Sequence, residues 1–193
     1  MPRLWSETIE THRREVREAI LEATAALVVE HGLRAVTMSQ VAEAAGIGRA
    51  TLYKYFPDIE SILLAWHEGK IGGHLADLAA IRDRTGGGAS SRLEAVLEAY
   101  AEMSRETSNR HYSDVGMFLH RDEQVAGARR QLHEVIRDLI AEGAAEGDLR
   151  DDVNAHELAA FCLHALAAAR ALPSRAAVAR LVAVTMDGLR GPF

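Results

Sequence analysis

The sequence contains a single cysteine, Cys162, among its 193 residues. One cysteine forms neither a disulfide within the chain nor a cysteine cluster that holds a metal ion. The sequence also lacks a secretory leader and any long apolar run, so we expect a cytoplasmic protein without a membrane span.

Proline and aromatic residues are also scarce. Of the four prolines, only Pro57 lies between Pro2 and Pro173, and aromatic residues make up 5% of the chain. Alanine, leucine, glutamate and arginine prevail, and no segment alternates apolar and polar residues as a strand would. The sequence therefore predicts an all-α protein with room for one sizeable domain or two small ones.

An overall excess of positive charge is absent as well. The formal net charge is −6, whereas a protein that coats nucleic acid without specificity is expected to be basic. Locally the balance of charge reverses. Arg49 and Lys54 lie between Glu43 and Asp58, and no acidic residue lies in that interval. Further cations with possible phosphate contacts are Arg13, Arg14, Arg17 and Arg34.

The stretch TMSQVAEAAGIGRATLYKYF, residues 37 to 56, predicts two short helices joined by a tight turn. Thr37 followed three residues later by Gln40 is a capping box at the start of the first helix. Gly46 suits the left-handed turn position, which a residue with a Cβ resists. Pro57 ends the second helix, because it disfavours helical geometry in the residue before it.

The second of these helices has two different faces. Leu52 and Phe56 share the face that we expect in the core. The other face carries two cations, a phenol and a small residue, which suits a helix lying in a DNA major groove. The residues expected at the DNA are Thr37, Ser39, Gly48, Arg49, Ala50, Thr51, Tyr53 and Lys54.

This pattern resembles the DNA-binding region of the tetracycline-repressor (TetR) family over about residues 16 to 66. The segment AEAAGIGRATLYKYFPD is similar to that family's helix-turn-helix signature, including its Leu-Tyr-x-x-Phe run. Two positions depart from the family pattern: Ile59 replaces a lysine that usually meets a phosphate, and Gly48 replaces a more usual serine. The resemblance implies a homodimer that binds an operator in double-stranded DNA and is released from it by a small-molecule effector.

We expect a helix-turn-helix domain at residues 1–57 and a helical effector-binding and dimerisation domain at residues 58–193, with about nine helices in total. The main part of the first helix is predicted at residues 12–31, after a polar arm that is either loose or adds a turn to this helix. A short sixth helix is predicted at residues 112–120.

The segment at residues 156–172 is apolar on nearly every side, so a helix there must be covered on two sides. Together with the last helix it favours a four-helix bundle across a two-fold axis, as the resemblance also implies. The alternative is a core formed within one chain. The expected interface residues are Phe161, Leu166, Leu181, Val182 and Met186.

The resemblance also implies an effector pocket among the middle helices. A mostly apolar cavity with a few polar anchors is typical of ligand sites, but the same side chains equally fill a core. The candidate pocket residues are Trp66, Leu78, Leu97, Tyr100, Met103, Met117, Phe118, Arg121 and Phe161. The sequence does not identify the effector.

Two adjacent glycines, Gly72 and Gly73, lie inside the predicted fourth helix. Paired glycines are a recognised site of helix kinks. One interpretation is that they let the helix bend when a ligand binds. The other is that a neighbouring helix packs closely against them.

An enzyme is not expected. Cys162 and His164 are two residues apart, so on a regular helix they point about 200° apart and cannot act as a nucleophile and its base. No phosphate loop, dinucleotide fingerprint or nucleophile elbow is present, and we expect no cofactor and no metal site. The sequence thus predicts a ligand-responsive transcriptional regulator, most simply a repressor. The alternative is an all-α ligand-binding or interaction module without operator recognition.

Overall fold

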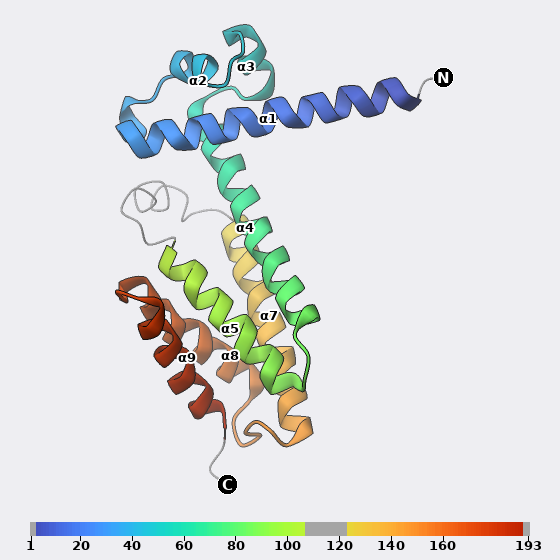
Figure 1. Cartoon of the computed structure of the whole chain (residues 1–193), viewed down its shortest axis with the longest axis vertical. Coiled ribbons are helices and arrows are strands. Elements are labelled where there is room, and N and C mark those ends of the chain that lie inside the picture. The colour runs from blue at the N-terminus through green and yellow to red at the C-terminus, as the bar shows by residue number, and fades with distance from the viewer. Residues whose placement is uncertain (1–2, 107–122, 191–193) are drawn as a thin grey trace. The chain divides into compact units, whose positions relative to one another are not determined.

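A computed structural model describes residues 3–106 and 123–190, and these are entirely helical apart from turns (Figure 1). The predicted all-α class is confirmed. The elements in chain order are α1 (Arg3–His31), the 3-10 turn η1 (Leu33–Ala35), α2 (Met38–Ala44), α3 (Arg49–Tyr55), α4 (Ile59–Arg84), α5 (Ala89–Glu106), α7 (Glu123–Glu146), α8 (Ala155–Ala167), the 3-10 turn η2 (Ala168–Ala171) and α9 (Arg175–Leu189).

The chain divides into two compact units, and the division falls inside α4 between Lys70 and Ile71. The domain boundary predicted between residues 57 and 58 lies at the start of that helix and remains a prediction. Each unit has a hydrophobic core of its own.

The core of the first unit gathers apolar side chains from α1, α2, α3 and the first part of α4. Its buried residues are Ile20, Leu21, Val28, Val36, Val41, Ala42, Leu52, Phe56, Ile62, Leu63, Ala65 and Trp66. The buried side chains of α1 supply one wall of this core. Burial of these side chains holds α2 and α3 in place.

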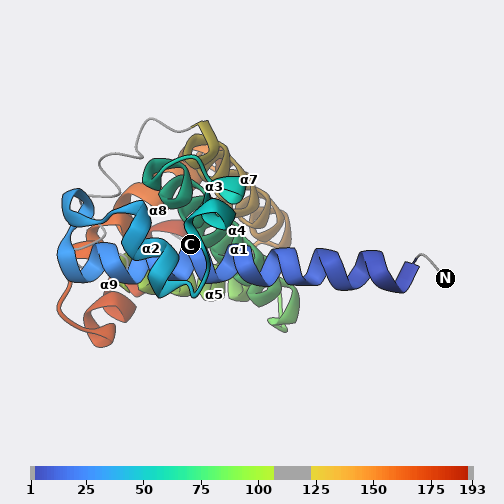
Figure 2. The ribbon, with the colours of Figure 1, turned by 90° about the horizontal axis from the view of Figure 1, so that it is seen from above.

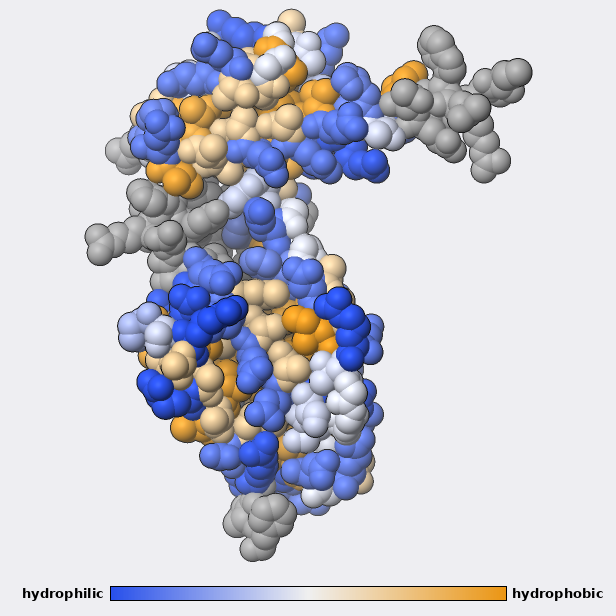
Figure 3. All heavy atoms as spheres, in the orientation of Figure 1, coloured by the Kyte–Doolittle hydropathy of each residue, from blue (hydrophilic) through white to orange (hydrophobic). Residues whose placement is uncertain are grey.

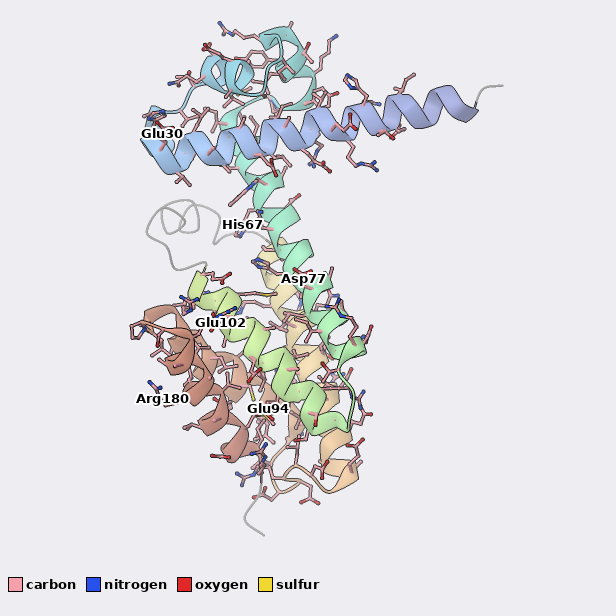
Figure 4. All side chains as sticks on the ribbon, in the orientation of Figure 1. Glu30, His67, Asp77, Glu94, Glu102 and Arg180 are labelled. Atoms are coloured by element: carbon pink, nitrogen blue, oxygen red, sulfur yellow. The ribbon has the colours of Figure 1, made fainter. Side chains whose placement is uncertain are left out.

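In the second unit α5 is the central helix, and it packs against α7, α8, η2 and α9. In Figures 1 and 2, α5 lies beside both the α7–α8 pair and α9. The largest fully buried side chains of this unit are Leu93, Val96, Leu97, Ile136, Ile140, Leu166, Met186 and Leu189. Two ion pairs join α5 to the α9 region: Arg175 lies 3.6 Å from Glu102, and Arg190 lies 3.6 Å from Glu94. Figure 4 labels both glutamates on α5.

Several predicted boundaries need correction. The first helix begins at Arg3, so the polar arm is helical and adds more than the one turn that was expected. The apolar segment predicted as one helix over residues 156–172 is α8 followed by η2, with the α-helix ending at Ala167. The predicted sixth helix lies outside the described residues.

Candidate nucleic-acid interface

A reciprocal cap starts α2. The Thr37 N–H donates to Oε1 of Gln40 at 2.9 Å, and the Gln40 N–H donates to Oγ1 of Thr37 at 3.4 Å. Val36 and Val41 on either side of the cap are both buried. The predicted capping box is therefore confirmed, and it sets where α2 enters the domain.

A glycine turn joins α2 to α3. Gly46 has φ of +67°, the left-handed conformation that favours glycine. The Ile47 N–H donates to the Ala42 carbonyl oxygen at 2.9 Å, and the Ile47 side chain packs partly buried against the core. This turn sets the angle between the two helices, as the sequence predicted.

The α3 helix presents the two faces expected of it. Leu52 has no exposed surface and Phe56 is buried, so one face is anchored in the core. Tyr53 is 48% exposed, and the other residues expected at DNA are also exposed except Thr51, which is half-buried. α3 ends at Tyr55 just before Pro57. The helix is thus held rigidly from behind while its polar face is open.

The two cations of α3 face solvent. Neither Arg49 nor Lys54 forms an ion pair with another described residue. Both side chains are exposed, so they are available to an external anion. Two such cations beside a phenol on a short helix fit the phosphates and base edges of DNA.

The start of α4 explains one departure from the family pattern. Ile59 is half-buried and packs against the first unit's core. Asp58 caps the helix, accepting a hydrogen bond of 2.8 Å from the Ser61 N–H. The Asp58 N–H is directed at Oγ of Ser61, 3.4 Å away. At the start of α4, Ile59 therefore serves the core and Asp58 serves as the helix cap.

The structure does not bring all candidate pocket residues together. Trp66 lies in the core of the first unit, whereas Leu78 and Leu97 lie in the core of the second. Tyr100 and Met103 are half-buried at the edge of that second core. Phe161 is 46% exposed and so does not line an interior cavity of this chain. Met117, Phe118 and Arg121 lie outside the described residues.

The expected interface residues also need correction. Leu166, Val182 and Met186 are at most 1% exposed and belong to the core of their own subunit, so the side chains face inward. Leu181 is half-buried. The apolar residues that face outward on α8 and α9 include Phe161 and Val184, and Val184 is 68% exposed. Sequence reasoning missed Val184, although its offset of two residues from Val182 places it on the opposite side of the helix.

Residues that might have suggested catalysis do not assemble a site. Cys162 is fully buried, and burial raises the pKa of its thiol to about 12, so it is protonated at neutral pH. His164 is exposed, and its Nδ1 lies 2.7 Å from the Ala160 carbonyl oxygen. Among the described residues no group of three or more His, Cys, Asp or Glu side chains is placed to hold a metal ion. Within the same residues, no helix has the length and apolarity needed to cross a membrane.

Comparison with known proteins agrees with this geometry. Residues 20–66 match the family described as bacterial regulatory proteins, tetR family, and residues 92–191 match the C-terminal domain of SbtR-like transcriptional regulators. The chain is 30% identical over 148 residues to the HTH-type transcriptional repressor KstR2 of Rhodococcus jostii. The aligned region covers 72% of this chain and 70% of that repressor.

Solved structures with the same fold are also found. A regulator of the TetR/AcrR family from Thermobifida fusca superposes with a TM-score of 0.76 at 21% identity, covering 91% of this chain and 98% of that one. FadR of Bacillus subtilis in complex with stearoyl-CoA gives a TM-score of 0.69 at 15% identity, covering 89% and 98%. At these identities the likeness concerns the fold.

Proposed function

Because this chain belongs to the TetR family of bacterial regulatory proteins, we propose that it is a repressor that binds a two-fold symmetric operator as a homodimer and leaves it when a small molecule binds. The observation that carries the proposal is the open face of α3. There Arg49, Tyr53 and Lys54 are exposed, while Leu52 is fixed in the core behind them.

The role of each side chain follows from its place on α3. Arg49 is the first residue of the helix, where recognition helices meet base edges, and a guanidinium binds guanine with two hydrogen bonds. Ala50 has a small side chain that lets the helix approach the groove closely. Lys54, in the last turn, contacts a phosphate of the DNA. Tyr53 donates a hydrogen bond from its hydroxyl to the sugar-phosphate backbone of the DNA. Thr37 and Ser39 at the start of α2 contact the neighbouring phosphates.

A homodimer is supported by the outward faces of α8 and α9. Phe161 and Val184 are large apolar side chains that these helices leave exposed. Figure 3 shows apolar spheres among the polar ones on the side of the second unit where α9 lies. Pairing two such faces across a two-fold axis buries them and doubles the cations offered to DNA. The two recognition helices then read half-sites about 34 Å apart.

A small-molecule effector is proposed for the second unit. The support is that FadR of B. subtilis, which has the same fold, binds stearoyl-CoA in its solved structure. Gly72 and Gly73 follow the unit boundary closely and are exposed, and a Cβ at either position would meet no atom within 4 Å. Close packing therefore does not account for these glycines. We infer that they let α4 bend when the effector binds, which changes how well the dimer fits its operator.

Two observations favour a second function. Ile59 packs into the core where the family usually has a phosphate-binding lysine, and the net charge is −6. Both features weaken attraction to DNA and suit a ligand-binding module without operator recognition. Binding to DNA separates the two functions directly.

The test is a mobility-shift titration on duplex DNA from upstream of the protein's own gene. We expect saturable binding that Arg49→Ala combined with Tyr53→Ala abolishes. Lys54→Ala alone lowers the slope of log affinity against log salt by about 0.9 for each phosphate that the lysine neutralises, whereas Tyr53→Ala weakens binding without changing the slope. Arg129→Ala, at an exposed arginine of α7, is the control for removal of a positive charge. Normal binding by the double variant would show that α3 is not the recognition helix.

A further inference from the structure

Residues 9–15 of α1 contribute no buried side chain to the core of their unit. Fully buried side chains on α1 begin at Ile20, and every described side chain from Ile9 to Glu15 is exposed. Figures 1 and 2 both show this part of the helix extending beyond α2 and α3. Residues 3–15 would span about 20 Å at the usual helical rise of 1.5 Å per residue.

Charge is sorted by sign around this helix. Arg13 and Arg17 are spaced so that they continue the buried stripe of Ile20, Thr24 and Val28 along one side. Arg14 flanks that side. Glu15 and Glu22 are spaced along the opposite side, Glu18 lies between them and Arg14, and Glu10 lies on the arginine face.

The arginine face of α1 meets the C-terminal end of α3. The guanidinium carbon of Arg17 lies 5.4 Å from the ring centroid of Phe56, the residue that caps the C-terminus of α3. The side of α1 that carries the arginines is therefore the side that it turns toward α3. Arg13 and Arg14 form no ion pair with another described residue.

One pair in this arrangement is unfavourable for the free protein. Arg13 and Arg17 are four residues apart, and like charges at that spacing destabilise a helix by a few tenths of a kcal/mol. A row of anions on the arginine face removes the repulsion. The sugar-phosphate backbone of duplex DNA is such a row, with one phosphate about every 3.4 Å along each strand.

We propose that the arginine face of α1, formed by Arg13, Arg14 and Arg17, binds the phosphates of the DNA that flanks each operator half-site. The inference rests on the proposed operator binding and extends it. It adds affinity that does not depend on sequence, because phosphates carry no base identity. Arg13 to Arg17 spans about 6 Å of helix, which is the rise of about two base pairs of DNA.

The experiment first uses footprinting with the variant Arg13→Ala, Arg14→Ala to locate the segment upstream of the protein's own gene that is protected without these two arginines. Binding is then measured against salt on two duplexes, the protected core alone and the core with about eight more base pairs of arbitrary sequence on each side, enough to exceed the proposed reach. The variant is Arg13→Ala with Arg14→Ala, which keeps Arg17 on Phe56 and retains helix propensity. The control is Arg129→Ala with Arg130→Ala, which removes the same charge from exposed positions of α7.

We expect the unmodified protein to bind the longer duplex more tightly and with a steeper salt dependence. The α1 variant should lower that slope by about 1.8 per subunit on the longer duplex and match the unmodified protein on the core. The inference is overturned if the unmodified protein binds both duplexes equally, or if the variant weakens both equally. Equal binding to the two duplexes leaves the proposed function standing without this inference, whereas binding to neither duplex removes both.

Discussion

The backbone N–H of Ala89 donates a hydrogen bond of 2.8 Å to Oε2 of Glu146, a residue 57 positions further along the chain. Ala89 is the first residue of α5 and Glu146 is the last residue of α7. Gly88 precedes α5 and has no side chain to cap it, and a Cβ there would lie 2.8 Å from the same carboxylate oxygen. A distant carboxylate therefore caps the central helix of the second unit, close to the positive end of that helix.

Replacing Glu146 with alanine removes this cap. We expect the free energy of unfolding to fall by about 0.5–2 kcal/mol, as for the loss of other helix caps. Glu146→Gln keeps an acceptor oxygen and should cost less. Chemical denaturation at fixed protein concentration measures both. Equal losses for the two variants would indicate that the charge, not the hydrogen bond, stabilises the start of α5.

Two sets of glycines should respond to alanine with opposite signs. Gly72 and Gly73 are exposed within α4, so Gly72→Ala with Gly73→Ala should raise the free energy of unfolding by about 1–2 kcal/mol through helix propensity. Gly143 is the control. A Cβ there would lie 2.6 Å from Cδ1 and 2.9 Å from Cγ of the buried Leu149, so Gly143→Ala should cost about 1–3 kcal/mol.

The same α4 variant tests the proposed bend. It should bind the operator with measurable affinity but respond less to an effector, once an effector is found by screening for release from DNA. Effector affinity measured separately distinguishes a stiffer helix from a damaged site. Full release by the variant with unchanged effector affinity would show that these glycines do not serve induction.

The thiol of Cys162 should make stability depend on pH in the alkaline range. Burial raises its pKa from an ordinary value of 9.0 to about 12, so the folded state keeps the proton that the unfolded state loses. Its contribution is full below about pH 9 and is lost as the pH rises toward about 12. Chemical denaturation across this range should show a smaller decline for Cys162→Ala than for the unmodified protein. If the free energy of unfolding declined equally for both proteins, the raised pKa of Cys162 would be contradicted.

A charge on the outward face of α9 should disrupt the proposed dimer. Val184→Glu would bury an unpaired carboxylate in the interface, so we expect it to sediment as a monomer at micromolar concentration. Val29→Glu, at an exposed valine of α1, is the control and should stay dimeric. A monomer for the unmodified protein would refute the homodimer. If Val184→Glu remained a dimer, the interface would lie elsewhere than on this face of α9.

Local signals in the sequence determined the helix-turn-helix almost completely. The Thr37–Gln40 cap, the left-handed Gly46 and the stop at Pro57 each act within four residues, so short-range chemistry specifies them without help from the rest of the chain. The two faces of α3 followed in the same way from helical spacing. The long reach of α1 was missed because its polar N-terminal half lacks the apolar periodicity from which helices are predicted.

Only the tertiary structure decided which sides of α8 and α9 face inward. The α8 segment is apolar nearly all round, so its spacing does not distinguish the buried Leu166 from the exposed Phe161. Within the subunit, α5 and α8 cover only one side of α9. Val182 and Met186 are on that side and are buried, whereas Val184 is on the other side and stays exposed. The cap from Glu146 to Ala89 joins residues 57 positions apart, and such a contact follows from how helices pack rather than from any local pattern.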